Sequence, residues 1–481
     1  EHFKDYLEGV IWKRETHKKL GTTLIETTSH QMKVGEIFKH LGKELTSRGL
    51  LLDPNPNRPI PDKGMVPMEH VDLVKLLRMF ITHFKSNSLT TEQLFDRLEG
   101  LPSGAFKYRF EMFLELAIPV IKGWNMALAK EQGIDFEDMI NLAAERLERG
   151  HPSPYNLVMA DEYQDTSRAR ARLCRALVAA PGRHLFAVGD DWQSINRFAG
   201  ADISVMTGFK EWFGHGQIYR LETTFRCPQE ICDVSSRFVS KNPAQLEKSV
   251  SSVTPAIGSA IQAFQVGNRN ELQGAVAQYL ADLYQSLVDG VVPAGRGGRV
   301  TVFILGRYKN DRQYVPEGWH DWFGDRIELK FKTIHTSKGD EADYVILPGL
   351  VARGFPNVKS DDPVLGLVMP EGDTYQHSEE RRLFYVALTR ARRSVAMFTV
   401  MGKSSPFLDE MIKEGAITLT NIPGEQIQED RCPNCKRGVM VTRHGKFGEF
   451  RSCSSFPMCF YKPKQQRMPT GQAAWSPKRH M

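Results

Sequence analysis

The chain has 481 residues, of which 41% are hydrophobic and 25% are charged, and its formal net charge is +6. This length predicts several domains, and the composition is that of an ordinary soluble protein. We find no apolar run long enough to span a membrane and no signal peptide, so the sequence predicts no membrane partner. The mild basicity permits a polyanionic partner without establishing one. Because the chain opens at Glu1, inside a helical pattern, we expect a piece of a longer protein.

The seven cysteines are unevenly placed along the chain. Three are scattered through its body, and four cluster near its end: Cys432, Cys435, Cys453 and Cys459. A disulfide framework is unusual in a large chain that is not secreted. The pattern therefore predicts a reducing compartment, the cytoplasm, and a metal site formed by the last four cysteines.

The first 150 residues are predicted to be mainly helical. A basic helix over residues 1–20 ends at Gly21, and a strand rich in β-branched residues follows over 22–28. Apolar periodicity then predicts helices over residues 35–45, 68–84, 91–98, 106–132 and 136–149. A loop rich in Pro and Asn interrupts them at 53–63. We expect a kink near Pro119, and Asp135 should cap the last helix, with Asp138 placed as in a capping box.

Two adjacent carboxylates, Asp161 and Glu162, follow the apolar run 157–160, which predicts a buried strand, and precede a helix over 167–179. In open parallel sheets, ligands bind at this end of the strands. One carboxylate can hold Mg²⁺ there while the next orients or deprotonates a water. A solvated turn would explain the same pair, so the pair alone does not decide.

Strands and helices alternate from here to residue 393, which indicates parallel α/β units in two sheets that divide near residue 215. Strands are predicted over residues 184–188, 217–221, 300–305 and 344–347, and another ends at 332–335; helices are predicted over 228–240, 271–287 and 379–393. Polar residues recur at the strand ends, namely Gln193, Arg226, Arg307, Lys338 and Arg390. Several such cations in a shared cleft suit a triphosphate, because arginine makes planar, bidentate contacts to phosphate oxygens.

Five segments resemble, in order, the motifs of UvrD/Rep-type superfamily 1 helicases. They are Asp161–Asp165 (motif II), Gly189–Asp202 (III), Phe225–Arg226 (IV), Thr333–Glu341 (V) and Glu379–Arg392 (VI). The resemblance covers residues 155–400. It implies an α/β fold with two RecA-like parallel-sheet lobes, ATP and Mg²⁺ as cofactors, and 3′–5′ movement on single-stranded DNA with unwinding of duplex DNA.

The resemblance also implies roles for single residues. Asp161 would bind Mg²⁺, Glu162 would activate the attacking water, and Gln193 would sense the γ-phosphate. The nucleotide would be bound by Phe225, Arg226, Arg307, Lys338, Gly339, Glu341 and Arg390, the last as an arginine finger. The DNA would be bound by Asn196, Phe198, Thr333 and His335. Phe198 would stack on a base, a contact that tolerates any sequence. A core aromatic after a turn is an equally good reading of Phe198.

Some positions depart from the commoner family pattern. Asn196 stands where an aromatic residue is usual, Ala199 where an arginine is usual, and Trp192 where a small acidic residue is usual. The stretch between Arg307 and Lys332 is too short for the large inserted helical domain of many relatives. No G-x-x-x-x-G-K-[ST] occurs in the chain, although that loop cradles the phosphates in the family. Either the loop lies upstream of Glu1 or the protein has lost hydrolysis, and we expect the first.

The terminal cysteines, two on each of two knuckles, predict tetrahedral Zn²⁺ coordination. Their surroundings resemble the C-terminal zinc ribbon of type IA topoisomerases. In that family the ribbon binds single-stranded DNA through basic and aromatic residues, here Arg443, Lys446, Phe447 and Tyr461. A ribbon that only docks another protein is the alternative.

These motifs divide the chain into predicted domains. Residues 1–30 would end an N-terminal region or insert of the first lobe, 31–150 form a helical accessory region, 151–215 the rest of the first lobe, 216–428 the second lobe, 429–463 the zinc ribbon, and 464–481 a disordered tail. The resulting hypothesis is an ATP-dependent DNA helicase of the bacterial cytosol or nucleoid, with repair or replication proteins as possible partners. The alternative is a non-hydrolysing DNA- or protein-binding module.

Overall fold

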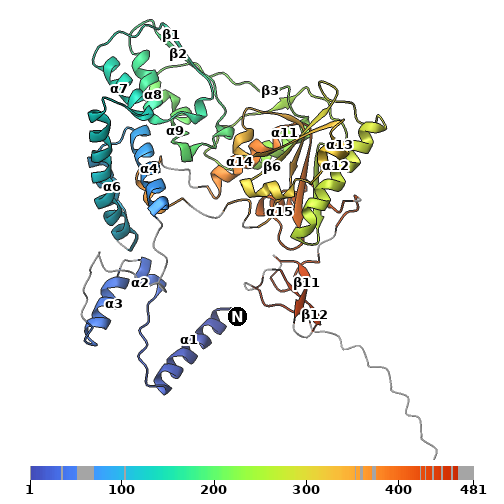
Figure 1. Ribbon diagram of the computed structural model, residues 1–481, viewed down its shortest axis with the longest axis horizontal. Coiled ribbons are helices and arrows are strands. Elements are labelled where there is room, and N and C mark those ends of the chain that lie inside the picture. Colours follow the sequence, from blue (N-terminus) through green and yellow to red (C-terminus); the bar gives the residue numbers. More distant parts are fainter. Residues whose placement is uncertain are drawn as a thin grey trace, which may run out of the picture.

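The structure is a computed structural model. It describes residues 2–33, 36–50, 70–101, 105–352, 354–357, 361–370, 375–422, 424–427, 430–435, 438–445, 448–454, 456 and 459–463. The loop expected at 53–63 and the tail expected at 464–481 lie outside these residues. The chain forms a helical region, a small two-stranded sheet, a six-stranded parallel sheet and a terminal hairpin (Figure 1).

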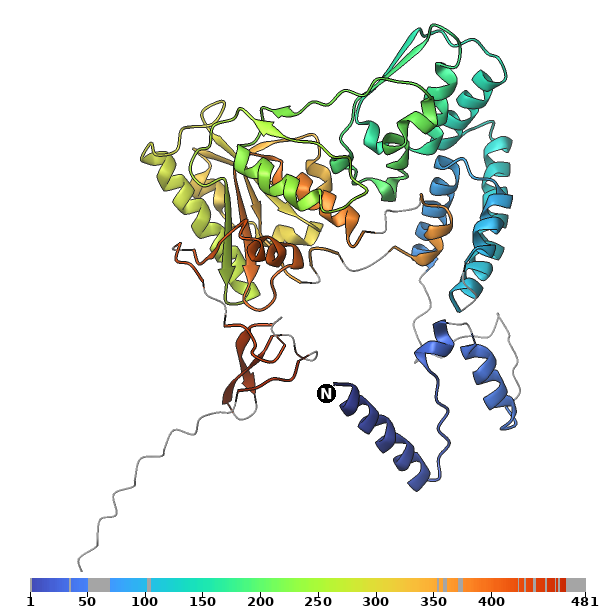
Figure 2. The same ribbon diagram turned by 180° about the vertical axis from the view of Figure 1, so that it is seen from behind.

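Three helices open the chain and lie apart from the rest in both views (Figures 1 and 2). They are α1 (His2–Lys19), α2 (Ser29–Lys33) and α3 (Ile37–Thr46). No described side chain between residues 7 and 50 is buried. The strand predicted over 22–28 is wrong: this segment has no strand partner within the described residues, and β-branched residues alone do not make a strand.

The helical accessory region is built from α4 (His70–Ser86), α5 (Thr91–Glu99), α6 (Ala105–Lys130) and α7 (Phe136–Glu148). Asp135 caps α7, since its Oδ1 accepts from the Asp138 backbone N–H at 2.8 Å. The Asp138 side chain does not complete a capping box. It accepts instead from Lys85 Nζ at 2.8 Å, and Asp135 Oδ2 accepts from the same ammonium at 2.6 Å. Lys85, buried on α4, thereby ties α4 to the start of α7.

Helix α6 runs through Pro119 without ending, as the sequence predicted for a single helix. By length and composition alone, its residues Lys107–Lys130 could cross a membrane, since an 18-residue stretch among them has a mean hydropathy of 1.3. The expectation that no apolar run has this length is therefore wrong. Phe110, Phe113 and Leu114 nonetheless pack into the core shared with α4 and α5, while Glu111 and Glu115 are exposed on the helix. The helix therefore buries one face in a protein core and leaves the other exposed.

A short segment of the second lobe completes this helical core. Between β8 (Ala342–Leu347) and α14 (Ser378–Leu388), the 3₁₀ helix η7 (Pro363–Leu367) and the two residues after it cross to the accessory helices and lie beside α4 (Figure 2). We call residues 363–369 the strap. Its buried apolar side chains are Val364, Leu365, Leu367, Val368 and Met369. Asn87 Nδ2 donates to Val368 O at 2.9 Å, and Arg97 donates to Leu367 O at 2.8 Å, which holds the strap by its backbone.

The first lobe has two parallel strands, β1 (Leu157–Ala160) and β2 (His184–Ala187), with Leu157 opposite His184. The helices α8 (Arg168–Leu177), α9 (Ser204–Thr207) and α10 (Phe209–Phe213) belong to the same lobe. The strand at 157–160 forms as predicted, but it is not buried: Leu157 and Met159 are exposed, as is Phe186 of β2. One face of this sheet is therefore apolar and uncovered by the described residues.

The strand predicted over 217–221 does not form. Tyr219 and Leu221 are 82% and 90% exposed, and no described strand pairs with this segment. Its apolar residues have the composition of a strand, but a strand needs a neighbour to satisfy its backbone. Only Thr223–Thr224 (β3) is paired, in parallel with Ser251–Ser252 (β4).

The second lobe is a six-stranded parallel sheet with the order β10-β5-β9-β8-β6-β7. Its strands are β5 (Ile261–Val266), β6 (Val300–Gly306), β7 (Ile327–Thr333), β8 (Ala342–Leu347), β9 (Ala391–Val400) and β10 (Leu419–Thr420). One core holds side chains of α11 (Gln229–Val239), α14 (Ser378–Leu388) and α15 (Pro406–Lys413). A second core holds those of α12 (Leu272–Val288) and α13 (Trp319–Phe323), so helices cover both faces.

The helix predicted over 379–393 is five residues too long. Helix α14 ends at Leu388, and Ala391 already begins the central strand β9. The apolar run 395–400 pairs with β5 on one side and β8 on the other, and this non-local pairing overrides the helical periodicity of the arginine-rich stretch. Arg390 consequently lies in the turn between a helix and the strand beside it.

If the strap holds the accessory helices together, replacing Leu365 by Ala should destabilise them. We expect a loss of about 2–5 kcal/mol, the usual cost of Leu→Ala in a core, seen as faster hydrogen exchange in α4–α6 with little change in β5–β9. Val71→Ala, at an exposed position of α4, is the control and should stay within about 0.5 kcal/mol. Equal exchange in both variants would contradict the packing role of the strap.

Candidate functional site

Asp161 and Glu162 lie at the carboxyl end of β1, and both are exposed. Glu162 has φ of 50°, in the left-handed region that is uncommon for residues other than glycine. Two contacts hold it there: its backbone N–H donates to Asp161 Oδ1 at 2.8 Å, and Gln164 Nε2 donates to its Oε2 at 2.5 Å. Gln164 was not singled out from the sequence, and its place inside the quoted motif was the only signal for it.

The segment that follows β2 packs against the turn that contains Glu162 and Gln164. Gly189 lets the chain approach Gln164, because a Cβ there would lie 2.7 Å from Gln164 Oε1. The Asp190 backbone N–H donates to that oxygen at 2.9 Å. The carboxyl ends of β1 and β2 thus share one hydrogen-bonded network, as neighbouring strands of a parallel sheet allow.

Lys338 brings the second lobe to these carboxylates. Its Nζ lies 2.7 Å from Asp165 Oδ2 and 3.4 Å from Glu162 Oε2, and it donates to Gln193 O at 3.0 Å. Asn196 Nδ2 donates to the same Asp165 oxygen at 2.7 Å. Asn196, predicted to contact DNA, therefore lies with the residues predicted for the nucleotide. Gly339 follows Lys338 with φ of 85°, a conformation that favours glycine.

The predicted arginines Arg226 and Arg390 lie close enough to interact. Burial, with Arg226 as the next contribution, lowers the pKa of the Arg390 guanidinium to about 10, so it stays charged at neutral pH. Arg390 donates to Gln193 Oε1 at 3.2 Å, and Arg226 Nε donates to Glu341 Oε2 at 3.1 Å. The structure brings these four predicted residues together from both lobes. Phe225, next to Arg226, is 76% exposed.

Beneath Arg226, the buried thiols of Cys227 and Cys232 approach to 3.6 Å, although the sequence gave no reason to pair them. The hydrogen bond from Cys232 lowers the pKa of Cys227, and Arg226 adds to the effect. Glu341 also pairs with Arg392, at 3.3 Å, so this carboxylate lies between two arginines, Arg226 and Arg392.

A second group of predicted residues lines a cavity of about 660 Å³ between the accessory helices and the two lobes. Phe198 and His335 meet there edge to face, with ring centroids 5.5 Å apart. Arg307, predicted for the nucleotide, lines the same cavity and is held by Glu380 through two nitrogens, the closer contact being 2.6 Å. The structure thus separates Arg307 from Arg226 and Arg390 and places it with the residues predicted for DNA.

His335 is neutral in this cavity. Burial, reinforced by the Arg307 charge, lowers its pKa from 6.5 to about 4. Thr333, at the end of β7, is partly buried, and its hydroxyl lies 3.0 Å from the Thr336 hydroxyl. Phe198 is about half exposed, so it is not the core aromatic that the sequence left open.

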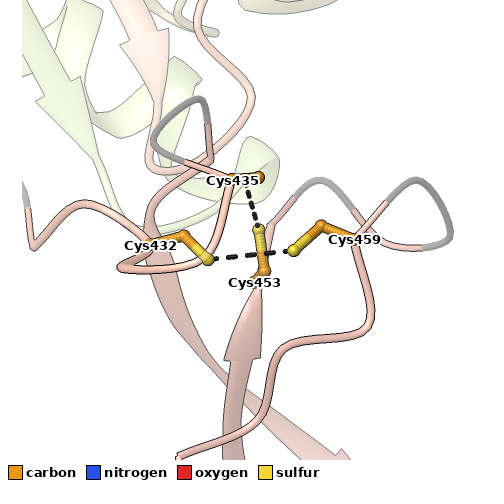
Figure 3. A group of neighbouring side chains, drawn as sticks. All are labelled: Cys432, Cys435, Cys453 and Cys459. Atoms are coloured by element: carbon orange, nitrogen blue, oxygen red, sulfur yellow. Dashed lines mark hydrogen bonds between the residues drawn. The ribbon is translucent and has the colours of Figure 1, made fainter. Parts of the chain in front are cut away.

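The four terminal cysteines form one cluster (Figure 3). Cys432 Sγ and Cys459 Sγ are 3.8 Å apart, Cys435 Sγ and Cys453 Sγ are 3.6 Å apart, and all four sulfurs lie within 4.8 Å of one another. Four sulfurs at about 2.3 Å from a tetrahedral Zn²⁺ would be separated by about 3.8 Å. The donor set therefore fits zinc, as the spacing predicted.

The ribbon around this cluster is the hairpin of β11 (Met440–Gly445) and β12 (Gly448–Cys453). Arg443 donates to Ser452 Oγ at 2.9 Å, and its guanidinium lies 5.8 Å from the Phe456 ring. Phe456 and Phe460 are exposed and 5.2 Å apart, edge to face. Neither was singled out from the sequence, although both flank the last cysteines. The predicted Lys446 and Phe447 lie outside the described residues.

These features define a two-lobed protein of the helicase fold with a four-cysteine zinc ribbon. Comparison with known families agrees: the UvrD/REP helicase N-terminal domain matches residues 10–214, the UvrD-like helicase C-terminal domain matches 321–401, and the topoisomerase DNA binding C4 zinc finger matches 429–467. The chain belongs to the UvrD/REP helicase family.

Curated relatives include DNA helicase IV of Escherichia coli, 36% identical over 62% of this chain and 42% of that protein. The ATP-dependent DNA helicase PcrA of Staphylococcus epidermidis is 25% identical over 48% of this chain and 31% of that protein, and a probable DNA helicase of Mycoplasma pneumoniae is 24% identical over 63% and 57%. The chain thus spans less than two thirds of each relative. A solved structure of PRRSV helicase, 16% identical over 63% of this chain and 43% of that one, reaches a TM-score of only 0.27.

Purified protein should contain one zinc ion per chain, and Cys453→Ser should reduce that content severalfold by removing one of four ligands. Elemental analysis after gel filtration measures it. Cys174→Ser, outside the cluster, is the matched control and should keep its zinc. Full zinc content in Cys453→Ser would contradict the site.

His335 should make the fold sensitive to acid. Its pKa is about 4 when folded and about 6.5 when unfolded, so between these values the unfolded chain binds more protons and stability falls as the pH falls. His335→Gln should therefore show a shallower loss of unfolding free energy from pH 6.5 to 4.5 in urea titrations. His320→Gln, at an exposed histidine, is the control. An unchanged pH slope in His335→Gln would count against the burial of this imidazole.

Proposed function

We propose that the full-length protein is an ATP-dependent DNA helicase that couples ATP hydrolysis to movement along single-stranded DNA and to unwinding of duplex DNA. The observation that carries this proposal is the meeting of predicted hydrolytic residues from both lobes. Lys338 reaches Glu162 and Asp165, and Arg390 reaches Gln193. A ligand bound at this junction would change the contacts between the lobes, which is how hydrolysis can drive a relative movement.

Under this proposal, each residue at the junction would have its own role in ATP hydrolysis. Asp161 and Glu162 are exposed carboxylates at a strand end and fit a hard, oxygen-liganded Mg²⁺, which would help neutralise phosphate charge when bound. Glu162, held by Gln164, would orient and deprotonate the attacking water. Arg226 and Arg390 would stabilise charge developing on the γ-phosphoryl group.

The phosphate-binding loop is the part that these 481 residues do not supply, since they contain no G-x-x-x-x-G-K-[ST]. We propose that a further segment of the same protein supplies it and completes the first lobe. The uncovered apolar face of β1 and β2 and the unpaired apolar segment at 217–221 support this idea, because apolar faces of this kind are normally buried by further strands or helices.

For DNA, we propose two contact regions. Phe198 and His335 offer aromatic faces in the cavity between the lobes and the accessory helices, and bases stack on such faces without sequence preference. On the ribbon, Arg443 beside the exposed Phe456 and Phe460 combines a cation with aromatic rings. The 3′–5′ direction, a bacterial cytosolic or nucleoid location, and repair or replication partners are proposed by family resemblance.

A non-hydrolysing DNA- or protein-binding module is the second candidate. The missing phosphate loop favours it, because Glu162 and Arg390 cannot hydrolyse a nucleotide that is not held. The two candidates differ in one measurable property, the hydrolysis of ATP by the full-length protein in the presence of single-stranded DNA.

In the full-length protein, Glu162→Gln should lower DNA-stimulated ATP hydrolysis by about 10²- to 10⁴-fold, the usual contribution of a general base, while ATP binding is retained. Glu145→Gln, a surface change on α7, is the control and should hydrolyse normally. The 481 residues alone should show almost no hydrolysis. Full turnover in Glu162→Gln would refute the role of Glu162, and a full-length protein without DNA-stimulated hydrolysis would favour the non-hydrolysing module.

A further inference from the structure

Lys248 lies in the second lobe, between α11 and β4 and outside all five motifs. Its Nζ nonetheless contacts the first lobe. It pairs with Asp190 Oδ1, lies 2.8 Å from Asp191 Oδ1, and is 4.3 Å from the centroid of the Trp192 ring. The side chain is largely buried, so these contacts are shielded from bulk water more than a surface pair would be. A single cation therefore joins two consecutive carboxylates and the aromatic residue that follows them.

The contact continues from Lys248 to Gln193. Asp190 uses one carboxylate oxygen for Lys248, and its other oxygen accepts from Gln193 Nε2 at 2.7 Å. The opposite end of the Gln193 amide, Oε1, accepts from Arg390 at 3.2 Å. Asp190 accepts from the amide nitrogen, and Arg390, which has only donors, donates to the amide oxygen, so both partners favour the same orientation of Gln193. Asp190 thus helps to hold the Gln193 oxygen toward Arg390.

The charge on Lys248 is what makes this arrangement stable. Asp190 and Asp191 are adjacent carboxylates, and Asp191 is buried, so without a counter-charge they would repel each other in a poorly solvated place. Asp191 Oδ2 also accepts hydrogen bonds from Gln245 Nε2 at 2.7 Å and from the Leu246 backbone N–H at 2.8 Å. The Trp192 ring offers its face to the ammonium, an interaction that an acidic residue at this position could not provide.

We propose that Lys248 is a positioning residue for ATP hydrolysis: by holding Asp190, it keeps the Gln193 amide oxygen directed at Arg390 in the second lobe. This inference rests on the proposed helicase function. It predicts that the loss of Lys248 is felt through Gln193 and affects the hydrolytic step more than the binding of ATP.

The test uses full-length protein and DNA-stimulated ATP hydrolysis. Lys248→Met keeps the aliphatic stem against Trp192 and removes the charge, and kcat should fall about tenfold while KM for ATP changes less than twofold. Lys248→Arg should recover most of the activity. Lys241→Met is the matched control, because Lys241 also bridges two carboxylates, Glu410 and Glu414, near an aromatic ring but lies wholly within the second lobe. Its kcat should stay unchanged.

A double-mutant cycle separates positioning from general stability. In a Gln193→Ala background, Lys248→Met should cause no further loss, whereas a purely structural role would add its full effect. If Lys248→Met proves unstable, Asp190→Asn removes the same ion pair from the other side, and it should cause a similar loss of kcat.

The outcomes are distinguishable. Suppose the unmodified protein is active. An unchanged kcat in Lys248→Met, or in Asp190→Asn if that variant is used instead, would then overturn only the positioning role. Additive losses in the double-mutant cycle would do the same. Unmodified full-length protein that hydrolyses no ATP with DNA would overturn the proposed function and this role together.

Discussion

Lys338, like Lys248, joins the two lobes electrostatically. The carboxylates of Asp165 and Glu162 lie near each other at the end of β1, and the ammonium of Lys338 reaches both from the second lobe. The side chain of Lys338 is largely buried, so its charge acts in a setting where water screens it weakly. The contact between the lobes at this junction therefore depends on the pairing of these two carboxylates with Lys338. A cation bound by these carboxylates would compete with Lys338, whereas a bound anion would compete with the carboxylates for the Lys338 ammonium.

Much of the second lobe could be predicted from the sequence, because strands such as β6 and β8 are continuous apolar runs of parallel-sheet type. The errors share one cause. Strand β9 was partly assigned to the preceding helix, and residues 217–221 were assigned to a strand, because pairing depends on neighbours remote in sequence. Residues 395–400 find partners on both sides, whereas residues 217–221 find none among the described strands. Local composition did not distinguish the two cases.

The candidate site was predictable as far as its motif residues, since each motif is contiguous in sequence. The structure joins Glu162, Gln193, Lys338 and Arg390 into one group through an ion pair and hydrogen bonds. The division of these residues between the two parts of the site was not predictable. Arg307, expected at the nucleotide, lies in the cavity with Phe198 and His335, and Asn196, expected at the DNA, lies beside Asp165 and Lys338. Each is held by a partner from a distant segment. The same holds for Lys248, which meets Asp190 across 58 positions of sequence.

The strap makes the accessory helices a shared component of both lobes. These helices rest on the first lobe through α7 and α8, where Arg172 pairs with Glu148 at 2.5 Å. Their core, however, contains five apolar side chains of the second lobe. Returning each of those to water would cost about 1.5–3 kcal/mol, far more than shifting a surface ion pair. If the lobes rotate as the proposed function requires, the helices should therefore move with the second lobe and slide over α8, which would turn a small rotation at the junction into a displacement at the far end of α6.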